Sequence, residues 1–209
     1  MRKVLIICAL MMMVFSTVIF LTIGQVSPVD RNIIYIHVPA SACALLCFVI
    51  LFACSIVYLK NRNEKWDCIA AASGEVGFIF ATALNVTGMI FARAEWGVWW
   101  TPSVRLISSA ILWFLYAAYL ILRSSFENKR KRAVISAVFG IIGFIDVPIV
   151  YISARFIRDI HRPNFSFDTS WQNASLGLSI LATVILAGVL IWIRSDLLRM
   201  EEKINLIRE

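Results

Sequence analysis

Two histidines are the side chains of this 209-residue chain best suited to bind a metal. His37 lies in the segment RNIIYIHVPA and His161 in the segment ARFIRDIHRPN, and each stands beside a long apolar run. Neutral imidazole is a common metal ligand. A lone loop histidine is more often an idle solvent-exposed side chain. Two histidines on the same face of one protein would instead favour a pair of ligands.

A second group of unusual residues lies in the segment EWGVWWTPSVRLI. Trp96, Trp99 and Trp100 fall within five positions, and Arg93 and Arg105 flank them. Tryptophan forms belts at membrane surfaces, where the ring lies at the level of the lipid headgroups. The same ring offers a flat apolar surface whose N–H tolerates an interfacial position. The group is therefore either a membrane anchor or a platform for a flat, apolar and negatively charged ligand.

Haem is a ligand that needs all three residue types. Its iron can take a histidine on each axial face, its porphyrin packs on flat apolar surfaces, and its two propionates attract cations. The guanidinium fork matches a carboxylate bidentately, whereas an ammonium does not. Arg93 and Arg105, which bracket the tryptophans, are the better candidates for this contact. Arg155, Arg158 and Arg162 follow a helical spacing that could present them together with His161. The alternative is that arginines near helix ends merely reach the lipid headgroups.

The remaining sequence is that of a membrane protein. Hydrophobic residues make up 60% of the chain and charged residues 16%, whereas a soluble domain is about half apolar and a quarter charged. Roughly 20 apolar residues cross a bilayer as a helix. Six runs reach this length, at about 4–23, 38–59, 69–92, 104–122, 133–152 and 175–193. We predict an all-α fold: one bundle of six transmembrane helices over residues 1–209, in which residues 194–209 form a cytoplasmic helical tail.

The first run follows Met1-Arg2-Lys3 and resembles a secretion signal only in part. It is longer than the apolar region of a signal, and no small-x-small cleavage site follows it. We therefore expect it to remain as a transmembrane span.

The basic residues orient this bundle. Fourteen of the 20 Lys and Arg residues, including all six lysines, lie in the two tails and the loops on the side of the termini. Because cytoplasmic loops are enriched in Lys and Arg, both termini are predicted to be cytoplasmic. The two histidine segments and the tryptophan segment then share the outer face. The net charge of +7 reflects this bias and does not indicate a nucleic-acid partner.

Two acidic residues and five cysteines lie in or beside the apolar runs. An ionised acid at mid-membrane costs roughly 2.5–3.5 kcal/mol, so such a residue usually faces the bundle interior with a partner. Asp146 lies in the outer half of its run, near enough to matter to a ligand on the outer face. Glu75 lies toward the cytoplasmic side, where a structural hydrogen bond is its predicted role. The cysteines form no C-x-x-C or C-x-x-C-H motif, so neither a redox pair nor covalent haem attachment is encoded.

The order YIHVP, WGVWW…R and DVPIVYISARFIRDIH on six short spans resembles the haem exporter protein C family. Its members are membrane haem-handling subunits of the bacterial and archaeal cytochrome c maturation system, within the tryptophan-rich WWD group. The resemblance runs from about residue 31 to the end of the sixth span. This sequence departs from the usual loop pattern at Pro102 and Ser103, where the family has Trp and Asp, and Asp146 stands where a neutral amide is expected.

The resemblance implies a function and a set of roles. Haem b would be held transiently and without a covalent bond on the outer face, with His37 and His161 as axial ligands. The loop would be the haem-edge platform and the docking site of a haem chaperone, through Trp96, Gly97, Trp99, Trp100 and Arg105. Further partners would be the ATPase and permease subunits of an ABC-type complex and membrane lipid, in the inner (cytoplasmic) membrane. The chain would deliver haem and would not be an enzyme.

Two other classes of protein compete with haem delivery. A b-type cytochrome subunit that carries electrons would hold its histidines within the spans, often in pairs, and no histidine falls within the six runs. A solute transporter permease would need its ATPase on another chain, because no G-x-x-x-x-G-K-[ST] motif occurs. Gly74, Gly77 and Gly88 are only a thin version of the glycine pattern of unwound transporter helices. Haem delivery is the favoured function.

Overall fold

The computed structural model describes residue 7, residues 33–156 and residues 170–208. The regular structure of these residues is entirely helical, which confirms the predicted all-α class. Five segments are long and apolar enough to cross a membrane: Ile34–Asn61, Glu64–Trp96, Val104–Ser124, Lys129–Ser153 and Gln172–Ile204. They correspond to the second to sixth predicted spans. The first predicted span, residues 4–23, lies outside the described residues except for Ile7.

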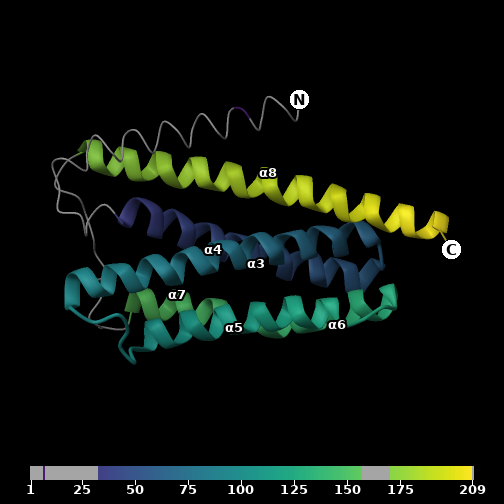
Figure 1. Ribbon diagram of the computed structural model, residues 1–209, viewed down its shortest axis with the longest axis horizontal. Coiled ribbons are helices and arrows are strands. Elements are labelled where there is room, and N and C mark those ends of the chain that lie inside the picture. The colour runs from purple at the N-terminus through teal and green to yellow at the C-terminus, as the bar shows by residue number, and fades with distance from the viewer. Residues whose placement is uncertain (1–6, 8–32, 157–169, 209) are drawn as a thin grey trace.

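The described helices form a bundle in three layers (Figure 1). The helices are α3 (Ile34–Asn61), α4 (Glu64–Trp96), α5 (Val104–Ser124), α6 (Lys129–Gly143), α7 (Asp146–Phe156) and α8 (Ser170–Arg208). The central layer is α3 with α4; α8 packs on one side of it, and α5 with α6 and α7 packs on the other. The end where α3, α5 and α8 begin is called the histidine end, because His37 lies in the first turn of α3. The opposite end, where α6 begins and α8 ends, is called the charged end.

A two-residue turn joins α3 to α4. Arg62 adopts a left-handed conformation, with φ of 55°, and its N–H bonds to the Tyr58 carbonyl at 2.8 Å. Asn63 then caps α4 through its side chain, which accepts from the Lys65 N–H at 3.0 Å. Both helices continue beyond the predicted spans, which stop at residue 59 and resume at 69. Charged residues that interrupt an apolar run still extend a helix when a cap and an ion pair are available.

The register of the α3–α4 pair follows from this turn. Both helices rise about 1.5 Å per residue, so residues equally far from the turn lie side by side. Leu51 and Gly74 each lie ten residues from the turn ends Asn61 and Glu64. A Cβ atom on Gly74 would approach Leu51 Cδ1 to 2.8 Å. The glycine therefore lets α3 and α4 come close at this level, as small residues do between membrane helices.

The fifth predicted span is broken, which the prediction of one continuous helix over 133–152 did not anticipate. Helix α6 ends at Gly143 and α7 begins at Asp146. Pro148 has no N–H to donate to the carbonyl of Phe144, four residues earlier. That carbonyl accepts instead from the N–H of Val147 at 3.0 Å. The backbone therefore tightens between the two helices, and Asp146 stands at the start of the second one.

The largest core cluster lies between the central layer and the layer of α5, α6 and α7. Phe48 of α3 stacks on Tyr116 of α5, with ring centroids 3.4 Å apart and planes 5° apart. Leu51, Leu112 and Tyr119 complete its fully buried centre. Helix α5 also packs on α4, α6 and α7, and these contacts together fix its position relative to the central layer.

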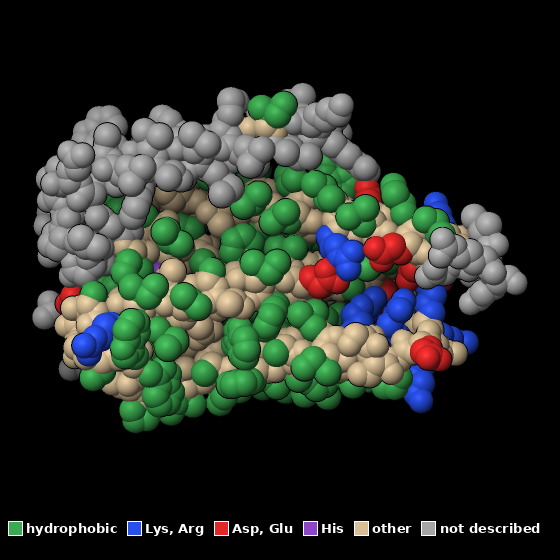
Figure 2. Space-filling model, in the orientation of Figure 1, with side chains coloured by type: hydrophobic (Ala, Val, Ile, Leu, Met, Phe, Trp, Pro, Cys, Tyr) green, Lys and Arg blue, Asp and Glu red, His purple; other side chains and the backbone are tan. Residues whose placement is uncertain are grey.

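Ion pairs hold the charged end together. Glu75 of α4 pairs with Arg194 of α8 through two contacts, at 2.5 and 3.1 Å, which confirms its predicted structural role. Asp67 of α4 accepts from Arg123 of α5 at 2.8 and 2.7 Å. Figure 2 shows Lys and Arg gathered near the C-terminal end of the bundle, mixed with acidic side chains, beside a largely hydrophobic flank. Helix α8 continues without a break through these charges to Arg208.

Candidate functional site

The imidazole ring of His37 packs against α4. It lies 24 residues before Asn61, and Gly88 lies 24 residues after Glu64, so the α3–α4 register brings the two to the same level. A Cβ atom on Gly88 would lie 3.2 Å from His37 Cε1. The neighbouring Thr87 places its Oγ1 atom 3.0 Å from His37 Nδ1. The imidazole thus rests on a ledge formed by a glycine and a threonine.

The depth of His37 differs from the sequence-based expectation. The apolar run was expected to begin at residue 38 and to leave this histidine at its mouth. The structure places His37 inside the candidate span Ile34–Asn61, with a half-buried side chain. Its partner Thr87 precedes Trp96, the last residue of α4, by nine residues, or about 13 Å along the helix. The ring therefore lies below the tryptophan loop and not beside it.

The tryptophan loop divides into a packed part and an exposed part. Trp96 is partly buried and meets the ring of Phe91 edge to face, with centroids 5.8 Å apart. Trp99 and Trp100 are 55% and 46% exposed. The loop then ends at Ser103, whose side chain caps α5 by accepting from the Leu106 N–H at 3.3 Å. Only the two exposed rings offer a surface of the kind predicted for a flat ligand.

Two further predicted site residues shape this loop. Gly97 ends α4 with a φ of 74°, the left-handed region that glycine adopts without strain. Nothing lies within 4 Å of the position its Cβ would take, so the backbone angle and not space requires glycine here. Arg93 donates to the Gly97 carbonyl and lies 6.0 Å from the centroid of the Trp99 ring. Arg93 therefore braces the loop from the last turn of α4.

Arg105 and Asp146 lie in different surroundings. Arg105 is half-buried in the first turn of α5, directly after the loop. Asp146 is buried, with 8% of the residue exposed, beside the core residues Val147 and Val150. Its Oδ2 atom has no hydrogen-bond partner among the described residues. It precedes Phe156, the end of α7, by ten residues, or about 15 Å, so it is an interior residue of the bundle.

The third outer segment is only partly described. Arg155 belongs to α7, which ends at Phe156 at the histidine end (Figure 1). His161, Arg158 and Arg162 lie outside the described residues. The pairing of His37 with His161 therefore stays a prediction.

The sequence as a whole decides the family. The model of the family "Heme exporter protein C" matches residues 1–209. The chain belongs to the heme exporter protein C family.

Individual relatives of this family are distant. The chain is 25% identical over 193 residues to Heme exporter protein C of Escherichia coli (strain K12), which covers 86% of this chain and 79% of that protein. It is 30% identical over 135 residues to Heme exporter protein C of Paracoccus denitrificans (strain Pd 1222), which covers 62% and 56%. It is also 27% identical over 157 residues to a "ccmC-like mitochondrial protein" of Marchantia polymorpha, which covers 75% and 65%. The chain thus spans a little under two thirds of the last of these relatives.

The structure of this family member also shows polar residues that sequence reasoning missed. Thr82 accepts from Trp113 Nε1 at 2.9 Å, and Asn85 Oδ1 accepts from the Ser109 hydroxyl at 3.3 Å. With Thr87, they form a series of polar residues on α4 in the half nearer the histidine end. Their signal in the sequence was the series Thr, Asn and Thr at positions 82, 85 and 87 in an otherwise apolar run. Polar residues within a span usually face the bundle interior.

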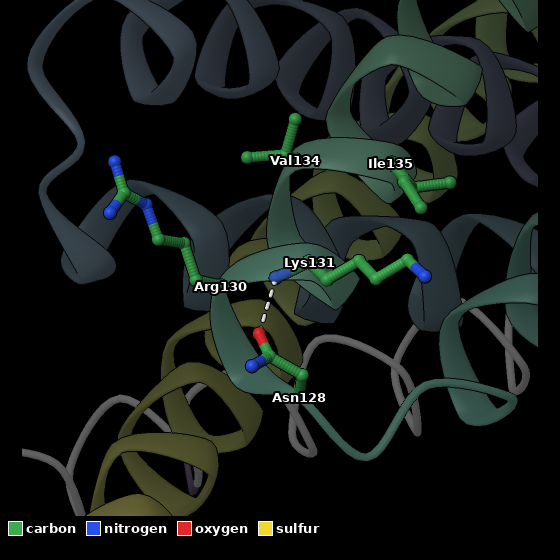
Figure 3. A pocket seen from close by; sticks show the side chains of 5 residues that line it. All are labelled: Asn128, Arg130, Lys131, Val134 and Ile135. Carbon is green, nitrogen blue, oxygen red and sulfur yellow. Dashed lines mark hydrogen bonds between the residues drawn. The ribbon is translucent and has the colours of Figure 1, made fainter.

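Two hollows lie at the charged end, away from the predicted site. One, of about 390 Å³, is lined by Asn128, Arg130, Lys131, Val134 and Ile135. In Figure 3 the Arg130 and Lys131 side chains point in opposite directions, and Asn128 caps α6 by accepting from the Lys131 N–H at 2.9 Å. The other, of about 360 Å³, lies among ion-pairing residues that include Glu75 and Arg123. Neither contains a residue predicted to bind haem.

Proposed function

We propose that this chain is a haem-binding membrane subunit of cytochrome c biogenesis, which holds haem at the histidine end and passes it to a haem chaperone. One observation carries the proposal: a histidine in the first turn of α3 whose Nδ1 atom is paired to Thr87 on the neighbouring helix α4. It lies at the end of the bundle that also exposes Trp99 and Trp100. Haem is the proposed ligand because the relatives in this family are named heme exporters.

The axial ligands in this proposal are His37 and His161. Helix α7 ends at the histidine end, and His161 follows Phe156 by five residues. Five residues of chain reach at most about 18 Å, so the sequence separation is compatible with a second ligand at that end. Bis-histidine ligation without a C-x-x-C-H motif leaves the haem exchangeable, as a delivery protein requires. The cargo is therefore haem b, held transiently.

The other predicted residues take graded roles. Trp99 and Trp100 cover the haem edge or meet the chaperone, and Arg105 binds a propionate through its fork. Trp96, Gly97 and Arg93 give the loop its shape and act on the ligand through it. Asp146 acts on the site indirectly and does not contact haem, because its carboxyl is buried at the start of α7.

The partners and location follow the same proposal. The chain lies in the cytoplasmic membrane with its histidine end outside, among membrane lipid, and works with the ATPase and permease subunits of an ABC-type complex. Any ATP hydrolysis belongs to those subunits, so this chain itself is not an enzyme.

The test is the spectrum of the detergent-purified protein titrated with ferric haem. We expect a six-coordinate low-spin b-type spectrum. His37→Gly and His161→Gly should each lower haem occupancy, and added imidazole should partly restore it by entering the vacated position. The imidazole rescue is the control for misfolding, because a collapsed site would not respond. An unchanged spectrum in the double glycine variant would sink the proposal.

One observation favours a second candidate, a b-type electron carrier. His37 lies inside a candidate span and is fixed to a neighbouring helix, as a permanent haem ligand would be. The two functions differ in haem release. Apomyoglobin added in excess should extract haem from a delivery protein within minutes, whereas an electron carrier should retain it for hours.

A further inference from the structure

The hydroxyl of Thr87 has its single hydrogen already committed. Its Oγ1 atom lies 2.6 Å from the Ala83 carbonyl oxygen and 3.2 Å from the Leu84 carbonyl oxygen. A carbonyl can only accept, so the hydroxyl must donate along this direction. If the hydrogen pointed at His37 instead, two oxygen lone pairs would face each other at 2.6 Å. That arrangement is repulsive, and the donation to the backbone therefore wins.

This commitment fixes the proton of His37. The contact between Thr87 Oγ1 and His37 Nδ1 is 3.0 Å, an ordinary hydrogen-bond distance. Because the oxygen acts as the acceptor, Nδ1 must carry the hydrogen. In a neutral imidazole only one ring nitrogen is protonated. The lone pair therefore lies on Nε2.

Gly88 contacts the same imidazole ring at its Cε1 atom. The Cε1 atom, which lies between the two nitrogens, would be only 3.2 Å from a Cβ at this position. With glycine there, the ring can lie directly on α4 and reach Thr87. The contact partners of Nδ1 and Cε1 both belong to α4, so the two atoms together define how the ring is turned relative to that helix.

We propose that Thr87 is a positioning residue: its hydroxyl holds His37 in the Nδ1-protonated tautomer and so presents Nε2 to the haem iron. The ligation half of this statement rests on the proposed function, whereas the tautomer stands on the hydrogen bonds alone. Partners of this kind orient ligating histidines and raise their basicity, and losing one typically costs about 10- to 100-fold in metal affinity.

The first experiment reads the tautomer without haem. Because the chain has two histidines, a His161→Gly protein labelled with ¹⁵N-histidine gives ring signals from His37 alone. At pH 8 in detergent we expect the Nδ1–H tautomer. Thr87→Val removes the hydroxyl at nearly constant shape and should shift His37 toward the Nε2–H form, and Thr87→Ser should keep the native pattern. An Nε2–H tautomer in the protein with native Thr87 would overturn the proposal.

The second experiment measures haem affinity in proteins that retain His161. Thr87→Val should weaken ferric haem binding about 10- to 100-fold, and Thr87→Ser should stay close to the native affinity. The matched control is Thr82→Val, because Thr82 also bonds back to its own helix, at 2.8 Å, and across to another helix, yet not to His37. Equal losses in Thr87→Val and Thr82→Val would make the effect structural and overturn the positioning role.

The two experiments separate the possible failures. If His37→Gly leaves haem binding unchanged, haem ligation by His37 is wrong, and the positioning role of Thr87 is overturned with it. The tautomer measured by NMR would stand in that case. If His37→Gly abolishes binding but Thr87→Val does not weaken it, the proposed function survives and the role of Thr87 is refuted.

Discussion

Replacing the tryptophans of the loop one at a time distinguishes a membrane anchor from a ligand platform. The structure predicts that the three rings behave differently. Trp96 packs edge to face on Phe91 and is partly buried, whereas about half of Trp99 and of Trp100 is exposed. Trp96→Ala should therefore lower stability, and Trp99→Ala and Trp100→Ala should lower haem affinity.

The magnitudes follow from these surroundings. The edge-to-face pair contributes about 0.5–1.5 kcal/mol beyond its buried area. Full burial of Trp would bring the cost of Ala to about 3–5 kcal/mol, so we expect about 2 kcal/mol for partly buried Trp96. A fully covered Trp buries about 150–250 Å². Covering the exposed half of Trp99 or Trp100 would remove about 75–125 Å² from water, which stabilises a complex by at most about 2–3 kcal/mol.

The assays are thermal unfolding in detergent and ferric haem titration of the same samples. Trp99→Ala and Trp100→Ala should each weaken haem binding at least about tenfold, or about 1.4 kcal/mol, with unfolding changed by less than about 0.5 kcal/mol. Trp96→Ala should reduce stability more than either. If the exposed pair instead lose membrane level and stability while haem affinity is unchanged, the rings are anchors and the platform is refuted.

Two more predictions concern contacts of α4 with α5 at the charged end and with α3 at His37. Asp67→Ala should destabilise the protein by about 3–5 kcal/mol, because it leaves the largely buried Arg123 without its carboxylate. Glu64→Ala, which removes an exposed partner of Lys129, should cost less than about 1 kcal/mol, and equal unfolding midpoints for the two variants would contradict this. Gly88→Ala should push the His37 ring from its ledge and weaken haem binding about tenfold without loss of helix content. Full affinity in both Gly88→Ala and Gly88→Val would show that the ledge does not position the ring.

The sequence predicted well those features that depend on composition along the chain. Five of the six predicted spans match candidate spans in the described residues, because a bilayer selects for length and apolarity alone. The ends were less well predicted. Asp67 lies outside the predicted run 69–92, yet it is buried within α4, where Arg123 reaches it from α5. Such a pair depends on tertiary packing that no local pattern records.

The candidate site residues could be chosen from the sequence by their residue types, but the residues that position them could not. His37 could be singled out because histidine is rare in this chain, and Trp99 and Trp100 because they cluster. Thr87 could not be chosen in the same way. Its role depends on which residue of α4 lies beside His37, that is, on the register of α3 and α4. The expected nine-residue loop between the spans left this register undefined. Once the turn is known to be two residues long, counting outward from it brings positions 37 and 88 together.

The same register explains the glycines of α4 and removes one argument for a transporter. Gly74, Gly77 and Gly88 could have marked an unwound helix, but α4 runs unbroken from Glu64 to Trp96. A Cβ atom on Gly77 would lie 2.7 Å from Phe48 Cε1, as one on Gly74 would crowd Leu51 and one on Gly88 would crowd His37. All three glycines therefore make room for α3 along α4, and Gly74 also makes room for Tyr119 of α5. Because α3 and α4 lie close together at Gly74 and Gly77, the same register holds at Gly88. There the neighbouring side chain is the imidazole of His37 and not an apolar group. A substitution deep in the bundle, such as Gly77→Leu, should consequently disturb His37 from a distance.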